Sequence, residues 1–170
     1  MPKTDRAPWI ALPVETELGE FRASYSNTGL AELRFPTNRT TSTAAKPTSV
    51  PAKVHEWHRV TTDAVRQILS GREPKALPPF DLSSGTEFQQ GVWRAMMKIP
   101  LGQTSSYGGL ASAVGKPKAV RAVGGACGAN PIPVLVPCHR VLAANNKLGG
   151  FSSGLDRKRE LLKREGVTLI

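Results

Sequence analysis

The chain has 170 residues, a mass of 18.2 kDa and a formal net charge of +10 at pH 7. This length gives one domain or two small ones, and 39% hydrophobic with 21% charged residues is typical of a chain that folds. The sequence has no apolar run long enough to span a membrane, and its start lacks the apolar stretch of a secretory signal. Because two cysteines are too few for a disulfide framework, we expect a cytoplasmic protein with reduced thiols.

The positive charge is concentrated in the second half of the chain. Residues 1–85 carry 11 basic and 9 acidic side chains, net +2, whereas residues 86–170 carry 12 basic and 4 acidic ones, net +8. We therefore expect the second half to face any polyanionic partner. Charge alone does not separate a nucleic-acid-binding protein from the many small proteins that are mildly basic.

The first part of the chain, residues 9–36, predicts a meander of about three antiparallel strands. Partly alternating hydrophobic stretches are interrupted there by Gly19 and by an Asn-Thr-Gly turn. Residues 37–52 are rich in Thr, Ser, Pro and Ala and predict a surface loop or a partly disordered segment. Residues 53–71 have hydrophobic side chains at intervals of three and four, which indicates a helix that ends at Gly71.

The Pro-containing residues 73–85 predict a linker, and helices follow it. Ser84 or Thr86 is suited to cap the first helix. Further helices are predicted over about 105–114 and 119–129, and the last from Ser153 or Asp156 to Glu165. In this last helix we expect Leu155, Leu161 and Leu162 to point inward. Its basic residues are expected to point mostly outward; they are Arg157, Lys158, Arg159, Lys163 and Arg164.

The two middle helices are consistent with a helix–turn–helix. The first of them has the apolar, small, apolar and turn residues of that motif, at Leu110, Ala111, Val114 and Gly115. The second would expose Lys118 and Arg121. An ordinary helical hairpin explains the pattern equally well.

The second of these helices has very small side chains: Ala119, Ala122, Gly124, Gly125, Ala126, Gly128 and Ala129. Each glycine costs a helix up to ~1 kcal/mol relative to alanine, so we expect a gain from close backbone approach. Entry into a DNA minor groove, about 6 Å wide, would supply that gain. Helix-on-helix packing would use the same small face.

Residues 137–141 read Pro-Cys-His-Arg-Val and follow an apolar, proline-rich stretch. A cysteine in apolar surroundings is most often a structural thiol. Here His139 and Arg140 follow Cys138 directly, and prolines hold the backbone, which is what a positioned nucleophile requires. Neighbouring side chains point apart on a strand, so a bend or helix start must bring Cys138 and His139 together. Cys127 lacks such a setting and is expected to be a packing residue.

Several segments together resemble the methylated-DNA–protein-cysteine methyltransferase family. They are GTEFQQGVW at 85–93, RAVGGA at 121–126, NPIPVLVP at 130–137, PCHRV at 137–141 and GGFSSGLDRKRELLKREG at 149–166. The similarity is dense over residues 85–167 and looser over residues 9–80. Members of this family repair guanine alkylated at O6 and, to a lesser degree, thymine alkylated at O4.

The resemblance implies roles for individual residues. Cys138 matches the alkyl acceptor, His139 the base that deprotonates it through a water molecule, and Glu165 the carboxylate that orients the imidazole. A neutral thiol with a pKa of about 8.5 is a weak nucleophile, so such a base is needed. Asn130 matches a buried residue that ties the turn at the site, and Tyr107 a phenol that neutralises the departing guanine anion.

The remaining matches concern DNA and the pocket. Arg121 matches the arginine that enters the duplex where the base was extruded, and backbone groups of Val141 and Ser152 match those that hold the guanine edge. Lys158, Pro133 and Phe151 match further pocket positions. The helix surface expected to contact DNA comprises Lys118, Ala122, Gly124, Gly125 and Ala126.

The implied reaction uses double-stranded DNA that carries O6-alkylguanine, bound through its minor groove, with the base flipped into a pocket. The S-alkyl product is a stable thioether, so each molecule acts once and needs no cofactor. We expect no metal, because no cysteine precedes Cys127 and the two surface histidines His55 and His58 lack thiol partners. We expect a monomer with no membrane contact; cooperativity on DNA stays open.

The fold class expected is α+β with two domains. Residues 1–80 would form an N-terminal antiparallel sheet with a helix, ribonuclease H-like, as a support. Residues 86–170 would form a mostly helical domain with a helix–turn–helix, winged-helix-like, that binds DNA and transfers the alkyl group.

Three alternatives were weighed against this prediction. A non-catalytic protein that binds alkylated DNA is disfavoured by Cys138, because such relatives usually carry Trp there. A helix–turn–helix regulator would need Arg, Asn or Gln aimed at base edges, and the second helix is nearly bare. A cysteine hydrolase would need an oxyanion hole and a histidine distant in sequence.

Overall fold

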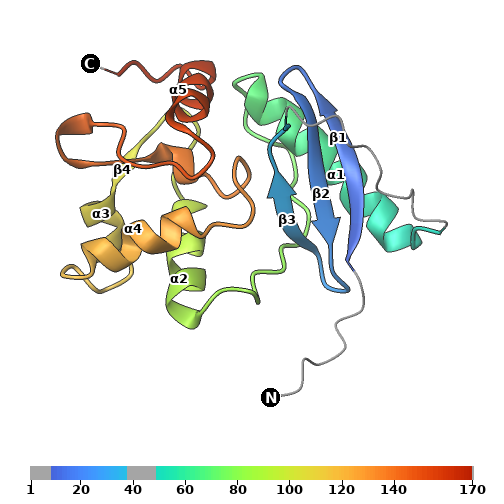
Figure 1. The fold of residues 1–170 in the computed structure, drawn as a ribbon, viewed down its shortest axis with the longest axis horizontal. Coiled ribbons are helices and arrows are strands. Elements are labelled where there is room, and N and C mark those ends of the chain that lie inside the picture. The colour runs from blue at the N-terminus through green and yellow to red at the C-terminus, as the bar shows by residue number, and fades with distance from the viewer. Residues whose placement is uncertain (1–8, 38–48, 170) are drawn as a thin grey trace.

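The computed structural model describes residues 9–37 and 49–169 (Figure 1). The predicted meander is confirmed as strands β1 (Ile10–Thr16), β2 (Gly19–Tyr25) and β3 (Leu30–Arg34), which pair antiparallel in the order β1-β2-β3. In this register Val14 lies opposite Phe21, and both are fully buried. The hydrophobic face of the sheet packs on helix α1, which spans Ala52–Leu69 close to the predicted range. The predicted loop over residues 37–52 falls mostly outside the described residues.

His58 differs from the expectation of a plain surface histidine. Its Nδ1 lies 2.8 Å from the hydroxyl of Tyr25 and its Nε2 lies 2.9 Å from the carbonyl oxygen of Pro13. Because a carbonyl only accepts, Nε2 carries the proton and Nδ1 accepts from the tyrosine. His58 is half-buried, and through these two hydrogen bonds it connects α1 to two strands of the sheet.

The predicted linker is partly fixed to the sheet. The amide of Leu30 donates to the carbonyl of Pro79 at 2.8 Å, and the amide of Asp81 donates to the carbonyl of Leu30 at 2.8 Å. Phe80 thereby forms a parallel bridge with β3. Gly29 permits this approach, because a Cβ there would lie 2.3 Å from the oxygen of Pro79.

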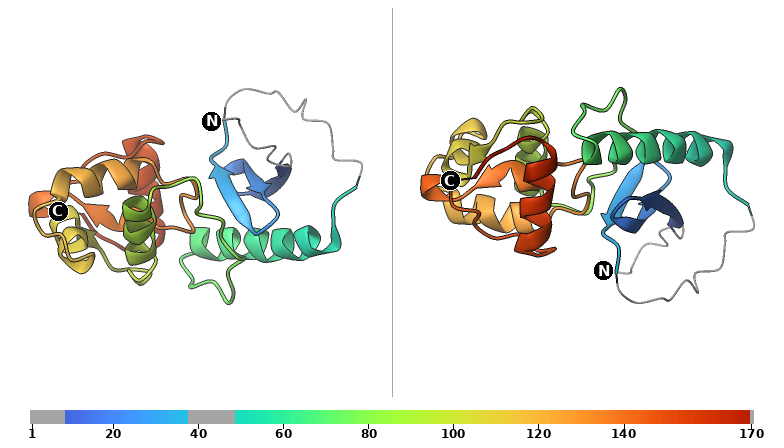
Figure 2. Two further views of the ribbon diagram at one scale, coloured as in Figure 1. Left: turned by 90° about the horizontal axis from the view of Figure 1, so that it is seen from below. Right: turned by 90° about the horizontal axis from the view of Figure 1, so that it is seen from above.

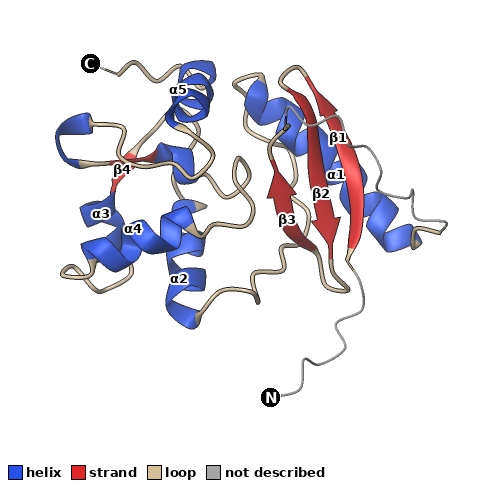
Figure 3. Ribbon diagram, in the orientation of Figure 1, coloured by secondary structure: helices blue, strands red, loops and turns tan. Residues whose placement is uncertain are grey.

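The second half of the chain is mostly helical, as predicted (Figure 3). Its helices are α2 (Glu87–Met96), α3 (Tyr107–Ala113), α4 (Val120–Gly128) and α5 (Leu155–Arg164). Thr86 caps α2 in a capping box with Gln89, and Trp93 donates its indole N–H to the carbonyl of Ala126 at 2.8 Å. The strands β4 (Ser105–Ser106) and β5 (Val141–Leu142) form a short parallel ladder.

Two predictions for α5 are wrong. Leu155 begins the helix and stays 41% exposed, while Lys158 is fully buried. The buried residues of α5 are Lys158, Leu161 and Leu162. Lys158 is accommodated because its ammonium group finds backbone carbonyls inside the protein, which sequence periodicity does not reveal.

Figure 2 shows the sheet with α1 beside the group of helices α2 to α5. The small antiparallel sheet and the helical part agree with the coarse α+β prediction, whereas the ribonuclease H-like and winged-helix descriptions stay predictions, as does the domain boundary. Among the described residues, no helix is long and apolar enough to cross a membrane.

Candidate functional site

Cys138 is held by a tightly tied loop. The side chain of Asn130 donates to the carbonyl of Val136 at 2.7 Å and accepts from the amide of Ile132 at 2.9 Å. Asn130 is half-buried rather than buried, but these two bonds close the loop as the resemblance implies. Val134 in this loop is fully buried with φ of 75°, a conformation that a β-branched residue rarely adopts. The loop is therefore held by its surroundings rather than by local preference.

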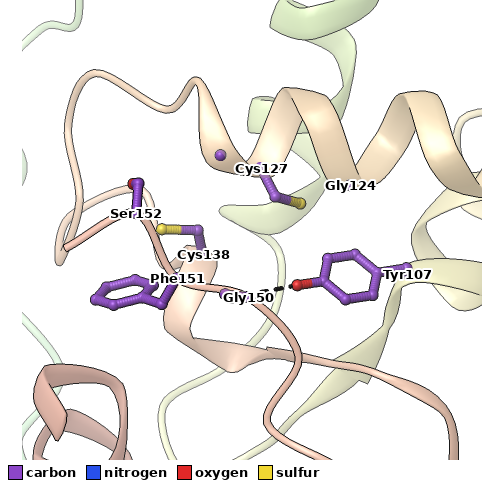
Figure 4. Close-up of a pocket in the computed structure, with 8 residues that line it drawn as sticks. Tyr107, Gly124, Cys127, Cys138, Gly150, Phe151 and Ser152 are labelled. Carbon is purple, nitrogen blue, oxygen red and sulfur yellow. Dashed lines mark hydrogen bonds between the residues drawn. The ribbon is translucent and has the colours of Figure 1, made fainter. Parts of the chain in front are cut away.

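The predicted helix start at the cysteine is present. A single 3-10 turn, η1 (Cys138–Arg140), begins at Cys138 and is buried throughout. The thiol of Cys138 lines a cavity of about 320 Å³ (Figure 4). The other residues that line this cavity are Tyr107, Gly124, Cys127, Gly128, Gly150, Phe151 and Ser152. These residues come from α3, α4 and the segment before α5, so three distant parts of the sequence meet at this sulfur.

Cys127 has two roles in the packing. Its sulfur lies 3.6 Å from the sulfur of Met96 in the core, as expected of a packing residue. It also lines the cavity beside Cys138, which the sequence did not indicate. Burial raises the pKa of Cys127 to about 12, so this thiol stays protonated near neutral pH.

Behind Cys138 lies a buried polar network. Nε2 of His139 lies 2.7 Å from Oε1 of Glu165, and Arg140 donates to both oxygens of Glu165 at 2.9 Å each. Arg140 also donates to the carbonyl of Ile99 at 2.6 Å. In the local sequence, only the position next to His139 points to this role of Arg140.

The ionisation states follow from burial and hydrogen bonding. Burial alone would raise the pKa of Glu165, but hydrogen bonds from His139 and Arg140 outweigh it and lower this pKa to about 2. The carboxylate is thus ionised and accepts the proton on Nε2 of His139. Burial lowers the pKa of His139, so the ring is neutral and its Nδ1 keeps a lone pair. Among the described residues, Nδ1 has no hydrogen-bond partner.

The thiol itself is neutral at rest. Burial raises the pKa of Cys138, although a hydrogen bond from Asn130 and the positive charge of Lys158 act in the opposite direction. The ammonium of Lys158 donates to the carbonyls of Val141 at 2.7 Å and Gly150 at 3.1 Å. A neutral, buried thiol therefore lies close to a positive charge, with a neutral imidazole as its sequence neighbour.

Tyr107 forms the opposite wall of the cavity. Its hydroxyl lies 3.4 Å from the carbonyl oxygen of Gly150, and burial raises its pKa. Gly149 has φ of +68°, and a Cβ there would lie 3.0 Å from the tyrosine ring. Glycine is needed at this position for both reasons.

The remaining residues that the sequence assigned to the pocket or to the DNA surface do not all lie at the cavity. Phe151 and Ser152 line the cavity, whereas Pro133 lines a neighbouring cleft that shares Ser152 with it, and Val141 lies buried beneath. Lys118, two residues before α4, is exposed, and so are Arg121, Ala122 and Gly125 on α4, as expected of a DNA-contacting surface. Gly124 is half-buried. Ala126 contradicts the expectation of a surface position, because it is 2% exposed and faces Trp93.

The small residues of α4 leave an open face. A Cβ added at Gly124, Gly125 or Gly128 would meet nothing within 4 Å. Close packing against another described helix therefore does not explain these glycines. Of the two explanations drawn from the sequence, entry into a DNA minor groove is left. No group of three or more His, Cys, Asp or Glu residues in the described ranges is arranged to hold a metal ion.

Comparisons with known proteins place the chain in a family. The family described as "6-O-methylguanine DNA methyltransferase, DNA binding domain" matches residues 87–167. A methylated-DNA–protein-cysteine methyltransferase of Methanosarcina acetivorans is 41% identical over 155 residues, which cover 89% of this chain and 95% of the relative.

Solved structures give the same result. The crystal structure of the Mycobacterium tuberculosis O6-methylguanine methyltransferase is 33% identical, covers 92% of both chains and has a TM-score of 0.72. A crystal structure of the enzyme from the same organism in complex with DNA is 35% identical, covers 91% of both chains and has a TM-score of 0.69.

Proposed function

Because the chain belongs to the methylated-DNA–protein-cysteine methyltransferase family, we propose that it repairs O6-alkylguanine, and less readily O4-alkylthymine, by moving the alkyl group onto its own Cys138. The observation that carries this proposal is the placement of a buried thiol in a cavity backed by the His139–Glu165 pair. Neither a structural cysteine nor a DNA-binding module requires a buried base beside it.

The transfer begins with proton removal. The proton of the Cys138 thiol passes through a water molecule to Nδ1 of His139, which is the free nitrogen of that ring among the described contacts. The ionised Glu165 stabilises the resulting imidazolium through Nε2. The thiolate is thus formed next to the substrate and inside the closed site, where its attack on the alkyl carbon is in line.

The substitution forms one S–C bond and breaks one O6–C bond. The electron pair of the broken bond goes to the guanine, and the phenol of Tyr107 donates the proton that neutralises it. The proton held by His139 then replaces, through solvent, the one that Tyr107 gave up, so the net change is loss of the thiol proton to the guanine. Lys158 keeps the Gly150 segment in place through its bond to that carbonyl. Backbone groups of Val141 and Ser152 hold the guanine edge, and Phe151 with Pro133 borders the alkyl group.

DNA approaches through α4. Its exposed Ala122 and Gly125, with the half-buried Gly124 between them, allow the backbone to enter a minor groove. Lys118 contacts phosphate, and Arg121 occupies the place of the extruded base. Because Gly124 and Gly128 of the same helix line the cavity, a flipped nucleotide passes directly from the groove to Cys138.

The product limits each molecule to one reaction. A thioether has no good leaving group, so neither water nor a second thiol regenerates Cys138. The protein acts as a monomer and without a cofactor. Its positive half supplies sequence-independent affinity, whereas the cavity selects the damaged base.

The decisive experiment measures the mass of the intact protein after incubation with an oligonucleotide duplex that bears one O6-methylguanine. We expect one added methyl group per molecule, on the peptide that contains Cys138, with no turnover beyond one equivalent. Cys138→Ser should gain no mass, whereas Cys127→Ser, which changes the other thiol of the cavity, should still gain one methyl group. Binding without a mass gain in the unmodified protein would favour a non-catalytic DNA-binding function, and multiple turnovers would contradict the suicide reaction.

A further inference from the structure

The N-terminal sheet reaches the outer side of the proposed alkyl-transfer cavity. Phe35, directly after β3, is 7% exposed, and its ring lies edge-on to Phe151, with the centroids 6.1 Å apart and an interplanar angle of 81°. The guanidinium of Arg157 lies 4.8 Å from the centroid of Phe35 and donates to the carbonyl of Pro36 at 2.5 Å. Phe35 is thus enclosed between the cavity wall and the start of α5.

Phe151 belongs to the segment that closes the cavity. On the inner side of this segment, the carbonyl of Gly150 lies within reach of the hydroxyl of Tyr107 and accepts from Lys158. Gly149 and Gly154 flank it with φ of +68° and +103°. Because glycines at both ends leave the backbone free to adopt other conformations, contacts on the outer side add to these inner hydrogen bonds in fixing its position.

Phe35 is itself held firmly in the sheet. Its ring packs on that of Phe21, with centroids 5.1 Å apart, and Phe21 is fully buried. One residue before the end of β3, the amide of Leu33 donates to the carbonyl of Pro131 at 2.9 Å, in the loop that carries Cys138. The same strand therefore anchors both loops that border the reactive sulfur.

We propose that Phe35 is a positioning residue for alkyl transfer, which acts through Phe151 to hold the Gly150–Ser152 wall at its distance from Cys138. This inference rests on the proposed function. In-line attack tolerates little displacement of the alkyl carbon, so the width of the cavity governs the rate of the transfer step. The N-terminal part then contributes to the reaction rate and not only to stability.

A single-turnover experiment separates positioning from stability. Each substrate, an O6-methylguanine duplex or free O6-benzylguanine, is mixed in excess with the protein, so that the amplitude counts the competent protein molecules, and the amplitude and the first-order rate constant are measured separately. For Phe35→Leu we expect the rate constant at saturation to fall by about 10-fold to 100-fold on both substrates, with the amplitude still one alkyl group per folded molecule. Phe35→Tyr keeps the ring and should recover most of the rate.

Tyr25→Leu is the matched control. It also removes an aromatic ring from the sheet, but Tyr25 faces Trp57 and His58 of α1 and not the cavity. We expect it to lower the folded fraction, and hence the amplitude, with an unchanged rate constant.

The outcomes distinguish this inference from the function on which it rests. If Phe35→Leu behaves like Tyr25→Leu and loses only amplitude, Phe35 has a structural role and the positioning role is overturned while alkyl transfer stands. If the unmodified protein itself takes up no alkyl group from either substrate, the proposed function fails and this inference fails with it.

Discussion

The two parts of the molecule bury different kinds of side chains. The sheet and α1 enclose an apolar core, and the buried residues there that carry a polar group, within the described ranges, are Tyr25, whose hydroxyl bonds to His58, and Thr61, whose hydroxyl donates to the carbonyl of Trp57 at 2.8 Å. The helical part buries four ionisable side chains close to one thiol, which are His139, Arg140, Lys158 and Glu165.

This difference indicates where the chemistry lies. A buried charge is costly to remove from water, and an apolar side chain of similar volume often gives equal or greater stability. Four such groups beside Cys138 are therefore not explained by stability alone. In the proposed reaction they serve as a base, its orienting carboxylate and the cations around the acceptor thiol, so they meet a requirement of that reaction rather than of the fold.

The largest expected effect tests whether the buried network must be complete. Glu165→Ala leaves Arg140 and His139 buried without their shared carboxylate, so we expect a loss of about 3–5 kcal/mol in the free energy of unfolding. Glu160→Ala, in the same helix, removes a partly exposed pair with Arg164 and should cost less than about 1 kcal/mol. Urea denaturation measures both. Equal losses would show that burial does not determine how much each carboxylate contributes to the free energy of unfolding.

The next effect is a dependence on pH. The pKa of Glu165 is lowered from 4.5 to about 2 in the folded protein, so its stabilising contribution is complete above pH 4.5 and is lost as the pH falls toward 2. The shift corresponds to a contribution on the order of 3 kcal/mol. Burial also lowers the pKa of His139 in the folded protein. As the pH falls, the unfolded chain therefore takes up a proton at this residue before the folded protein does, and the free energy of unfolding decreases, as it does for Glu165.

Glu165→Gln isolates the carboxylate in this measurement. The variant should be less stable than the unmodified protein at pH 7, and the difference between their free energies of unfolding should shrink below pH 4.5. Parallel pH profiles for the two proteins would mean that Glu165 does not carry the acid sensitivity.

Local sequence patterns predicted most of the fold. Alternation and helical spacing located β1 to β3 and the five helices α1 to α5, because each element shows its periodicity over its own residues. The proline-rich approach and the adjacent Cys138 and His139 also predicted the turn at the thiol. These features depend on neighbours in the sequence.

What the sequence did not predict depends on distant partners. Helical spacing places Lys158 outward, whereas the family resemblance matches it to the pocket, and in the structure carbonyls of Val141 and Gly150 receive its ammonium group inside. Arg140 reaches Ile99, 41 positions away. No local pattern contains such contacts, so periodicity alone assigns these residues to the surface.

The smallest expected effect concerns the surfaces of the two parts rather than their interiors. Ala52 of α1 and Ala122 of α4 are both exposed alanines on helices. Replacing either with leucine changes helix propensity little, so both variants should keep the free energy of unfolding within about 0.5 kcal/mol. If α4 enters a minor groove, however, only Ala122→Leu adds bulk to the bound surface.

We therefore expect Ala122→Leu to weaken binding to an O6-methylguanine duplex by about tenfold, or about 1.4 kcal/mol, at constant salt. Alkyl transfer from free O6-benzylguanine should be unchanged, because the cavity is lined by Gly124, Cys127 and Gly128 and not by Ala122. Ala52→Leu should change neither measurement. Unaltered duplex affinity in Ala122→Leu would remove the argument that the small face of α4 exists for close approach to DNA, and the glycines of this helix would then need another explanation.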